Sequence, residues 1–261
     1  MGLADQQIGG GRAVVLSIGE VTAWGVTHPW ASADQIEQDL LLSRAICEIA
    51  THPYLGKELV FRGGTALHKL HLLKPLRYSE DLDYVRVTAG GVGPVLDALK
   101  GIGRDLSFKV DSTIGEHPKV YWRTESQSGT RLRIKIEMNT HERSPALPLR
   151  QVPFSVESPW WTGAAKVQTF QLAELIATKL RALYQRSKGR DLFDMWLALT
   201  AAQVDVSEVL AAFPPYRPAG YTAKSAIINL EAKLTDSDFR RDVDVLTTQM
   251  PSEYDVDDAA A

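Results

Sequence analysis

The run from Arg131 to Met138 constrains the fold more than any other part of the sequence. Apolar residues alternate with charged ones along it, and a period of two is typical of a β-strand that buries one face. The apolar set comprises Leu132, Ile134, Ile136 and Met138, and the charged set comprises Arg131, Arg133, Lys135 and Glu137. The run therefore predicts a strand with one buried face and one polar face.

The remaining pattern places helices before and between such strands. Ser32 and Gln35 fit a capping box, which predicts a helix that ends near Pro53. Further strands are predicted at 59–61, 82–87, 106–110 and 120–123. Further helices are predicted at 65–74 (stopped by Pro75), 92–99, 172–186, 191–202, 225–234 and 239–246. This order favours a mixed α/β (α+β) core.

The domain organisation follows from composition. Pro145, Pro148, Pro153 and Pro159 predict a long connection. We therefore expect an α/β domain at 1–150, a helical lobe at 151–250 and a disordered acidic tail at 251–261. Cys47 is the single cysteine, which excludes a disulfide scaffold, and no apolar run or leader-like segment indicates a membrane span or a signal peptide. A cytoplasmic protein is the plain expectation.

The net charge of −3 argues at first against a nucleic-acid partner. The acidic tail accounts for much of it, however, and six basic residues stand between Lys166 and Arg190 against the single acid Glu174. Such a segment suits a phosphate-bearing partner, although a solvated helix face would have the same composition.

Asp81 and Asp83 lie two residues apart in the predicted strand at 82–87, so their side chains project on the same side. Two neighbouring carboxylates repel one another unless a cation lies between them, and Mg²⁺ typically takes one or two carboxylates plus substrate phosphates. A solvated strand edge is the alternative. Glu137 adds a third acid if its strand pairs beside this one, which would fit a two-metal site; otherwise it pairs on the surface with Arg133 or Lys135.

Gly63, Gly64 and Thr65 follow a predicted strand and open a helix. Glycines permit close approach of a phosphate to the backbone, and the N–H groups of a helix start attract anions. The same three residues can form a simple turn. They do not form a Walker loop, because the glycine-lysine element of that motif is missing.

Lys179 falls within the apolar stripe of the predicted helix at 172–186, whereas Arg181 falls on the opposite side. A lysine in such a stripe either extends outward or meets an anion, for which a nucleoside triphosphate is a candidate. Asp191 can cap the next helix or approach the site together with Arg190. His68 and His71 lack further ligands at zinc-binding spacing and are expected to be structural.

The sequence resembles the AbiEii-type nucleotidyltransferase toxins, which include the mycobacterial MenT group. The resemblance rests on four blocks of sequence. They are Phe61–Lys69 with Arg77–Tyr84, then Ile134–Glu137, Glu174–Leu183 and Gly189–Asp194.

This resemblance implies a DNA polymerase β-like nucleotidyltransferase core with a helical C-terminal lobe. It implies a toxin that transfers NMP from an NTP, in some members to the 3′ end of tRNA, and that has a cognate antitoxin. The family's catalytic residues correspond to Thr65, Asp81, Asp83, Lys179 and Asp191.

The interpretation that follows is a Mg²⁺-dependent nucleotidyltransferase. Asp81 and Asp83 would hold the metal, Gly63, Gly64, Thr65, Lys179 and Arg190 would bind the nucleotide, and Asp191 or Glu137 would orient the attacking hydroxyl. Transfer to a protein or small-molecule hydroxyl, and a non-catalytic nucleotide-binding module, remain alternatives. The sequence does not specify the NTP, the RNA or the oligomeric state.

Overall fold

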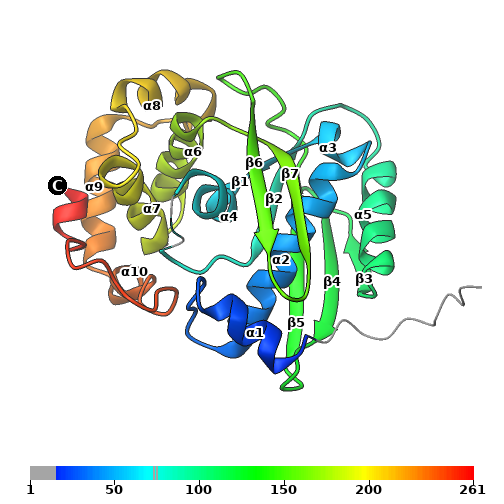
Figure 1. Ribbon diagram of the computed structural model, residues 1–261. Coiled ribbons are helices and arrows are strands. Elements are labelled where there is room, and N and C mark those ends of the chain that lie inside the picture. The colour runs from blue at the N-terminus through cyan, green and yellow to red at the C-terminus, as the bar shows by residue number, and fades with distance from the viewer. Residues whose placement is uncertain (1–15, 73, 75) are drawn as a thin grey trace, which may run out of the picture.

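A single seven-stranded sheet organises the molecule (Figure 1). The computed structural model describes residues 16–72, 74 and 76–261, so the first fifteen residues and the predicted stop at Pro75 lie outside the described residues. The strand order is β3-β4-β5-β2-β1-β7-β6. The strands are β1 (Leu59–Arg62), β2 (Asp81–Arg86), β3 (Lys109–Thr113), β4 (Lys119–Glu125), β5 (Arg131–Asn139), β6 (Arg150–Glu157) and β7 (Thr162–Thr169).

The core lies between one face of this sheet and the N-terminal helices. The alternating residues of β5 point into it as predicted, because Ile134, Ile136 and Met138 are almost fully buried there. Cys47 is also buried in this core, in keeping with a structural thiol. The helices on this face are α1 (Ile18–Gly25), α2 (Ala33–Thr51), α3 (Leu55–Glu58) and α5 (Gly93–Asp105).

The opposite face of the sheet is covered only in part. Val60 of β1 and Val85 of β2 pack against Leu175 of α6 (Leu172–Gln185) in a small apolar cluster. Because side chains alternate along a strand, the neighbours of these valines on the same face are Arg62 and Asp83. The helix α6 therefore anchors on β1 and β2 and overhangs the charged residues beside them.

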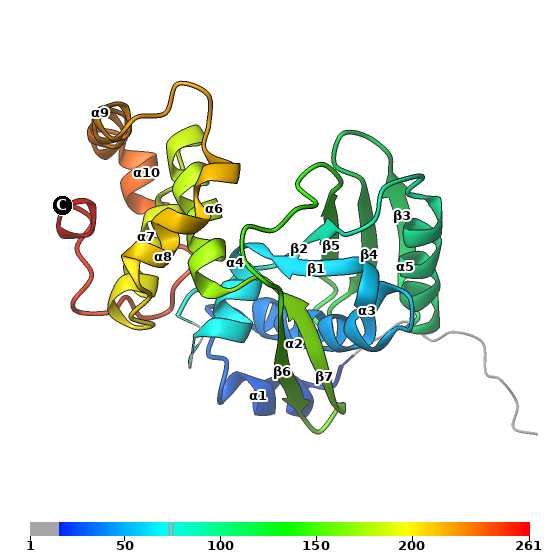
Figure 2. The same ribbon diagram turned by 90° about the horizontal axis from the view of Figure 1, so that it is seen from above.

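A helical lobe extends from α6 at the side of the sheet away from α5 (Figure 2). Its own apolar clusters join α6 to α7 and α8, with Ala177, Ala198 and Val209 among the buried residues. The lobe contains α6, α7 (Gly189–Thr200), α8 (Val206–Ala212), α9 (Ala223–Leu234) and α10 (Ser237–Arg241). The helix α8 and the shortness of α10 differ from the sequence-based expectation.

The segment at 145–159 differs most from its prediction. Instead of a long connection, residues 150–169 form the antiparallel hairpin of β6 and β7, and Phe61 of β1 pairs in parallel with Thr169 of β7. Pro153 is tolerated because β6 is an edge strand, where a missing N–H need not break a pairing ladder. The division near residue 150 therefore remains a proposal, and the hairpin favours placing it after Thr169.

The acidic segment 251–261, for which the sequence predicts disorder, is folded against the lobe in the structure. Tyr254 makes edge contacts with Phe193 and Trp196, and Asp257 forms a two-pronged ion pair with Arg240. The bounds of two other elements also differ from the prediction. The helix α5 continues to Asp105, so β3 begins at Lys109, later than predicted. No helix within the described part of the chain is long and apolar enough to cross a membrane.

Candidate active site

A row of charged residues crosses three neighbouring strands on the partly covered face. Arg62 of β1 lies opposite Asp83 of β2, and Asp83 lies opposite Glu137 of β5 in the parallel pairing of β2 with β5. The row continues to Lys119 of β4, which lies opposite Glu137. The strand that carries Glu137 pairs beside β2, which is the condition that the sequence left open, so the sheet brings Asp83 and Glu137 together and flanks them with a cation on each side.

Of Asp81, Asp83 and Glu137, Asp83 is the acid without a paired lysine among the described residues. Burial, repulsion by Asp81 and repulsion by Glu137 raise its pKa, and Arg62 opposes this shift only in part. Within the described ranges no hydrogen bond or ion pair reaches its carboxylate. An ionised Asp83 is therefore a charge that a bound cation would stabilise.

Asp81 and Glu137 share a lysine instead. The Nζ atom of Lys135 lies 2.8 Å from the Asp81 carboxylate and 3.3 Å from that of Glu137. Lys135 is one of the two surface partners that the sequence offered for Glu137. Lys119 is a second cation near Glu137, at 3.7 Å. Although burial opposes it, the hydrogen bond to Asp81 raises the pKa of Lys135, which keeps this ammonium charged.

Asp81 and Asp83 are the carboxylates that could hold a metal ion, and they would supply only part of its ligand shell. In the part of the chain that the structure describes, no group of three or more His, Cys, Asp or Glu side chains is arranged to hold a metal. Asp81 and Asp83 share one face, and the uncompensated charge of Asp83 is the specific feature that a cation would relieve. Mg²⁺ commonly binds through one or two carboxylates and completes its shell with water and phosphate.

The glycine pair brings the helix start against this acid. Gly63 has φ +80°, and a Cβ atom built on it would lie 2.4 Å from Oδ2 of Asp83. A Cβ on Gly64 would lie 2.5 Å from the Arg77 guanidinium. Both positions therefore require glycine for close approach. Thr65 is buried, and its hydroxyl donates to the Asp81 carbonyl at 2.6 Å, so it ties the loop to β2.

Lys179 of α6 lies across the cleft from Asp83 and Glu137. Its side chain is buried, as its place in the apolar stripe of the helix predicts. The anions that it meets belong to the chain itself. Its Nζ atom lies 3.1 Å from Asp191 and 2.8 Å from Asp194, both on α7. Arg186 binds the other side of Asp191 at 2.7 Å. Although burial opposes it, Lys179 and Arg186 lower the pKa of Asp191, which remains a carboxylate between them.

Asp194 anchors the same network to the segment before β2. Arg77 donates two hydrogen bonds to the Asp194 carboxylate, each 2.7 Å long. Nε2 of His68 lies 3.0 Å from Oδ1 of the same carboxylate. Despite full burial, Arg77 and Lys179 hold the pKa of Asp194 well below its usual range. Burial lowers the pKa of His68 to about 4, so this histidine is a structural partner, as expected.

A cleft of about 340 Å³ lies between the charged row and α6. It brings together Gly63, Gly64, Asp83, Glu137 and Lys179 of the predicted set. The lining residues that the sequence did not indicate as site residues are Arg62, Tyr84, His117, Asn139, Thr178, Arg181, Ala182, Gln185 and Arg186. Strand alternation puts Arg62 on the same face as Val60, and the pairing of β1 with β2 then places it beside Asp83.

Four predicted residues do not line the cleft. Thr65 is buried and Asp81 pairs with Lys135, and the other two, Arg190 and Asp191, lie in α7. Arg190 points away from the cleft and does not line it. Its guanidinium donates to both carboxylate oxygens of Asp242, at 2.8 and 2.9 Å. Asp191 is fully buried under Lys179 and Arg186, so it holds these two cations and does not itself face the cleft. Arg186 occupies the place that the sequence suggested for Arg190.

The comparisons with known proteins agree with this architecture. Residues 44–261 match the family described as nucleotidyl transferase AbiEii toxin, type IV toxin–antitoxin system. No curated protein matches the sequence.

Among solved structures, the chain is similar to MenT4, a nucleotidyltransferase toxin from Mycobacterium tuberculosis H37Rv. The TM-score is 0.53 at 20% identity, and the match covers 92% of this chain and 97% of that one. An antigenic nucleotidyltransferase-like protein from Paracoccidioides brasiliensis matches with a TM-score of 0.38 at 14% identity, over 83% of this chain and 94% of that one. The first likeness supports the nucleotidyltransferase fold.

Proposed function

Because the chain belongs to the AbiEii family of nucleotidyltransferase toxins, we propose that its cleft transfers NMP from an NTP to the 3′ hydroxyl of a tRNA. The observation that supports this most is the placement of Asp83 and Glu137 opposite Lys179 across a cleft rimmed by arginines. In the transfer, the acceptor oxygen forms a bond to the α-phosphorus, the bond to pyrophosphate breaks, and the hydroxyl proton is lost.

The cations of the cleft would bind the phosphates. Lys179 and Arg186 are held in position by Asp191, and Arg181 lines the same wall. Backbone N–H groups at Gly63 and Gly64 stand at a helix start, where an anion is favoured. Fixed charges of this kind stabilise the charge that develops on the leaving pyrophosphate.

Glu137 is the acid best placed to orient the acceptor hydroxyl and to receive its proton. It lines the cleft beside Asp83, whereas Asp191 is enclosed by its two cations. Asp81 and Asp83 would hold Mg²⁺ together with the phosphates. When bound, the metal would supply charge neutralisation at the reacting phosphate.

Transfer of label from an NTP to total tRNA tests the proposal. We expect Asp83→Asn to lower the transfer rate at least about 100-fold, because electrostatic stabilisation in an active site is usually a large term. Chelation of Mg²⁺ should lower it similarly. Asp97→Asn is the matched control, since Asp97 is an exposed acid on α5, on the far side of the sheet, and this variant should keep the wild-type rate.

The outcomes separate the alternatives. Label on protein or on a small molecule, with none on RNA, would reassign the acceptor but keep the chemistry. Binding of NTP without turnover by the wild type would identify a nucleotide-binding module. Equal transfer by Asp83→Asn and wild type would refute the assignment of the site.

Family membership also supports a cognate antitoxin as partner. We propose that expression of the chain slows growth and that its antitoxin restores it. Growth curves of cells that express the chain alone or together with a candidate antitoxin measure this, with Asp83→Asn as the inactive reference.

A further inference from the structure

The charged face of the sheet does not end at the cleft. Each strand step of two residues, about 6.6 Å, leads to another row on the same face. The row after Glu137 contains Lys135 and Tyr121, with the acids Asp81 and Asp111 at its two ends. The next row contains Arg133 opposite Arg123. Lys109 of β3 lies opposite Arg123 and extends this row. A path of basic residues therefore leads away from the proposed reaction centre.

Most of these cations lack an acidic partner. Arg131, Arg133 and Lys109 are exposed, and no ion pair reaches them from the described residues. Arg123 and Lys135 are the exceptions, because Arg123 pairs with Asp111 and Lys135 pairs with Asp81 and Glu137. We call Lys109, Arg123, Arg131, Arg133 and Tyr121 the basic face. Cations without acidic partners on an exposed surface are available to bind an external anion.

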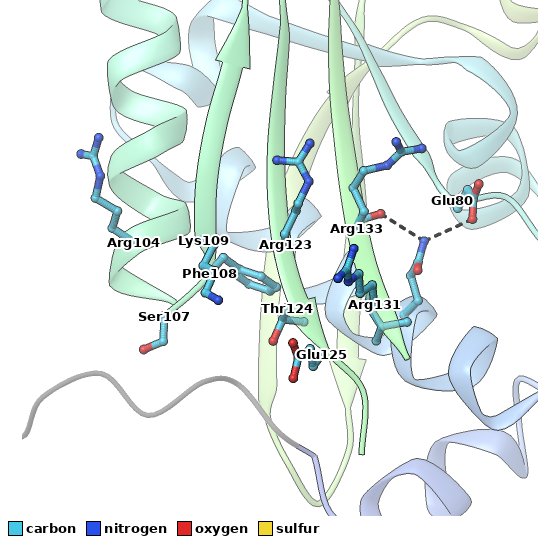
Figure 3. A pocket seen from close by; sticks show the side chains of 12 residues that line it. Glu80, Arg104, Ser107, Phe108, Lys109, Arg123, Thr124, Glu125, Arg131 and Arg133 are labelled. Carbon is cyan, nitrogen blue, oxygen red and sulfur yellow. Dashed lines mark hydrogen bonds between the residues drawn. The ribbon is translucent and has the colours of Figure 1, made fainter. Parts of the chain in front are cut away.

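The geometry of the basic face suits nucleic acid better than a simple anion. The guanidinium groups of Arg123 and Arg133 lie 5.0 and 5.5 Å from the centre of the Tyr121 ring. Figure 3 shows both arginines extending in the same direction from neighbouring strands. Flat guanidinium and aromatic groups stack on bases, while the charges bind phosphates.

A hollow at the end of the basic face away from the cleft is also lined mainly by positively charged residues. Its volume is about 940 Å³, and its basic lining residues are Arg104, Lys109, Arg123, Arg131 and Arg133. Two acids, Glu80 and Glu125, also line it. The surplus of positive charge therefore continues to the end of β3, β4 and β5 (Figure 3).

From these observations we infer that the basic face binds the phosphate backbone of a nucleic-acid acceptor whose 3′ end enters the cleft at Glu137. This inference rests on the proposed function for the direction of the strand, and it adds a binding surface outside the cleft. One row spacing is comparable with a single nucleotide step of an extended strand. Three row steps lead from Glu137 to Arg131, so the face holds the last few nucleotides before the reacting end.

Binding of fluorescently labelled tRNA, measured by anisotropy over a series of salt concentrations, tests the inference. The test variant is Arg131→Gln with Arg133→Gln. The control is Lys224→Gln with Arg241→Gln, which removes two exposed charges from the helical lobe. We expect the test variant to bind tRNA about 10-fold more weakly and to show a salt slope smaller by about 1.4, because each lost contact removes one phosphate neutralisation. The control should match the wild type.

Further measurements keep the inference separate from the proposed function. Circular dichroism verifies folding, and calorimetry should show unchanged NTP binding in the test variant. Equal tRNA affinity of the test variant and the wild type would overturn the inference, as would a wild type that turns over NTP without binding tRNA. Displacement of tRNA by polyglutamate at equal charge concentration would also overturn it, in favour of an acidic protein partner. If the test variant binds tRNA more weakly than the wild type but the wild type transfers no NMP, the binding surface is supported and the proposed activity is refuted.

Discussion

Gly63 shows how a single residue determines whether the cleft can form. Its backbone is left-handed, and the side-chain atom nearest to an added Cβ would be the Asp83 carboxylate oxygen. We expect Gly63→Ala to cost about 1–3 kcal/mol through backbone strain and to abolish transfer by displacing Asp83. Urea unfolding and the labelled-NTP assay measure the two effects.

Gly101→Ala is the control for this substitution. Gly101 lies in α5, and an added Cβ would meet nothing within 4 Å. The helix should gain about 0.5–1 kcal/mol from alanine. Similar responses of the two variants would show that the loop at Gly63 tolerates a side chain and would contradict the close approach.

Asp83 predicts a stability that depends on pH. Its pKa is raised in the folded state, so the fold favours the protonated acid and loses that contribution as pH rises through the folded-state pKa. Asp83→Asn should therefore be more stable than the wild type at pH 7.5, and the difference should narrow toward pH 4.5. Melting temperatures in metal-free buffer check this.

Added Mg²⁺ provides a second measurement of the same feature. A cation that binds the folded wild type raises its melting temperature, whereas the asparagine variant has lost a ligand. A wild type that is more stable than Asp83→Asn at pH 7.5 without metal would contradict the prediction.

Other residues show what one sequence cannot specify. Arg186 and Arg190 stand four positions apart in the same basic segment, yet Asp242, 52 residues beyond Arg190, withdraws that arginine from the cleft. The sequence left open whether Lys179 extends outward or meets an anion such as a nucleotide, and in the structure its partners are Asp191 and Asp194 of the following helix. Residue type and periodicity give the direction of a side chain, whereas its partner depends on tertiary contacts.

At the scale of elements, Asp194 joins α7 to α6 and to the segment before β2. Asp194→Ala would leave Arg77 and Lys179 buried without their shared partner, because these side chains are only 3% and 8% exposed. Removal of one partner from a buried ion pair costs about 3–5 kcal/mol. We expect a loss of this size in urea unfolding.

Asp242→Ala is the comparison, because its partner Arg190 is 34% exposed and water can replace the pair. Asp242→Ala should therefore lower the free energy of unfolding clearly less than Asp194→Ala does. The pKa of Asp194 is lowered by folding, so the stability from this acid is present at neutral pH and is lost on acidification. Equal losses for the two variants would contradict a special role for the buried network.

The success of strand prediction varied with position in the sheet. The alternation in β5 identified it nearly to the residue, because one face packs on the core and the other meets solvent. The hairpin of β6 and β7 was missed because its prolines resemble a loop, and Pro153 is permitted only by the edge position of β6. Edge position is a property of the assembled sheet and cannot be read from one strand.

At the scale of the whole molecule, the acidic segment 251–261 belongs to the folded lobe. Deletion of this segment should lower the melting temperature by several degrees, because Tyr254 would leave its contacts with Phe193 and Trp196. Calorimetry measures the shift.

Asp258→Asn is the control for the deletion, since it alters the charge of the segment and leaves Tyr254 in place. This variant should melt close to the wild type. An unchanged melting temperature after deletion would support the disordered tail that the composition suggests.

The parallel pairing of β2 with β5 also has a consequence for protein synthesis. The chain emerges from the ribosome from its N-terminus, and domains fold as their segments become available. Asp83 is made early, its neighbour Glu137 follows more than fifty residues later, and Lys179 with its partners on α7 comes later still. A nascent chain that stops before α7 therefore lacks Asp191 and Asp194, the acids that hold the cleft residue Lys179 in position. For a toxin, this order means that truncated translation products should be harmless to the cell that makes them.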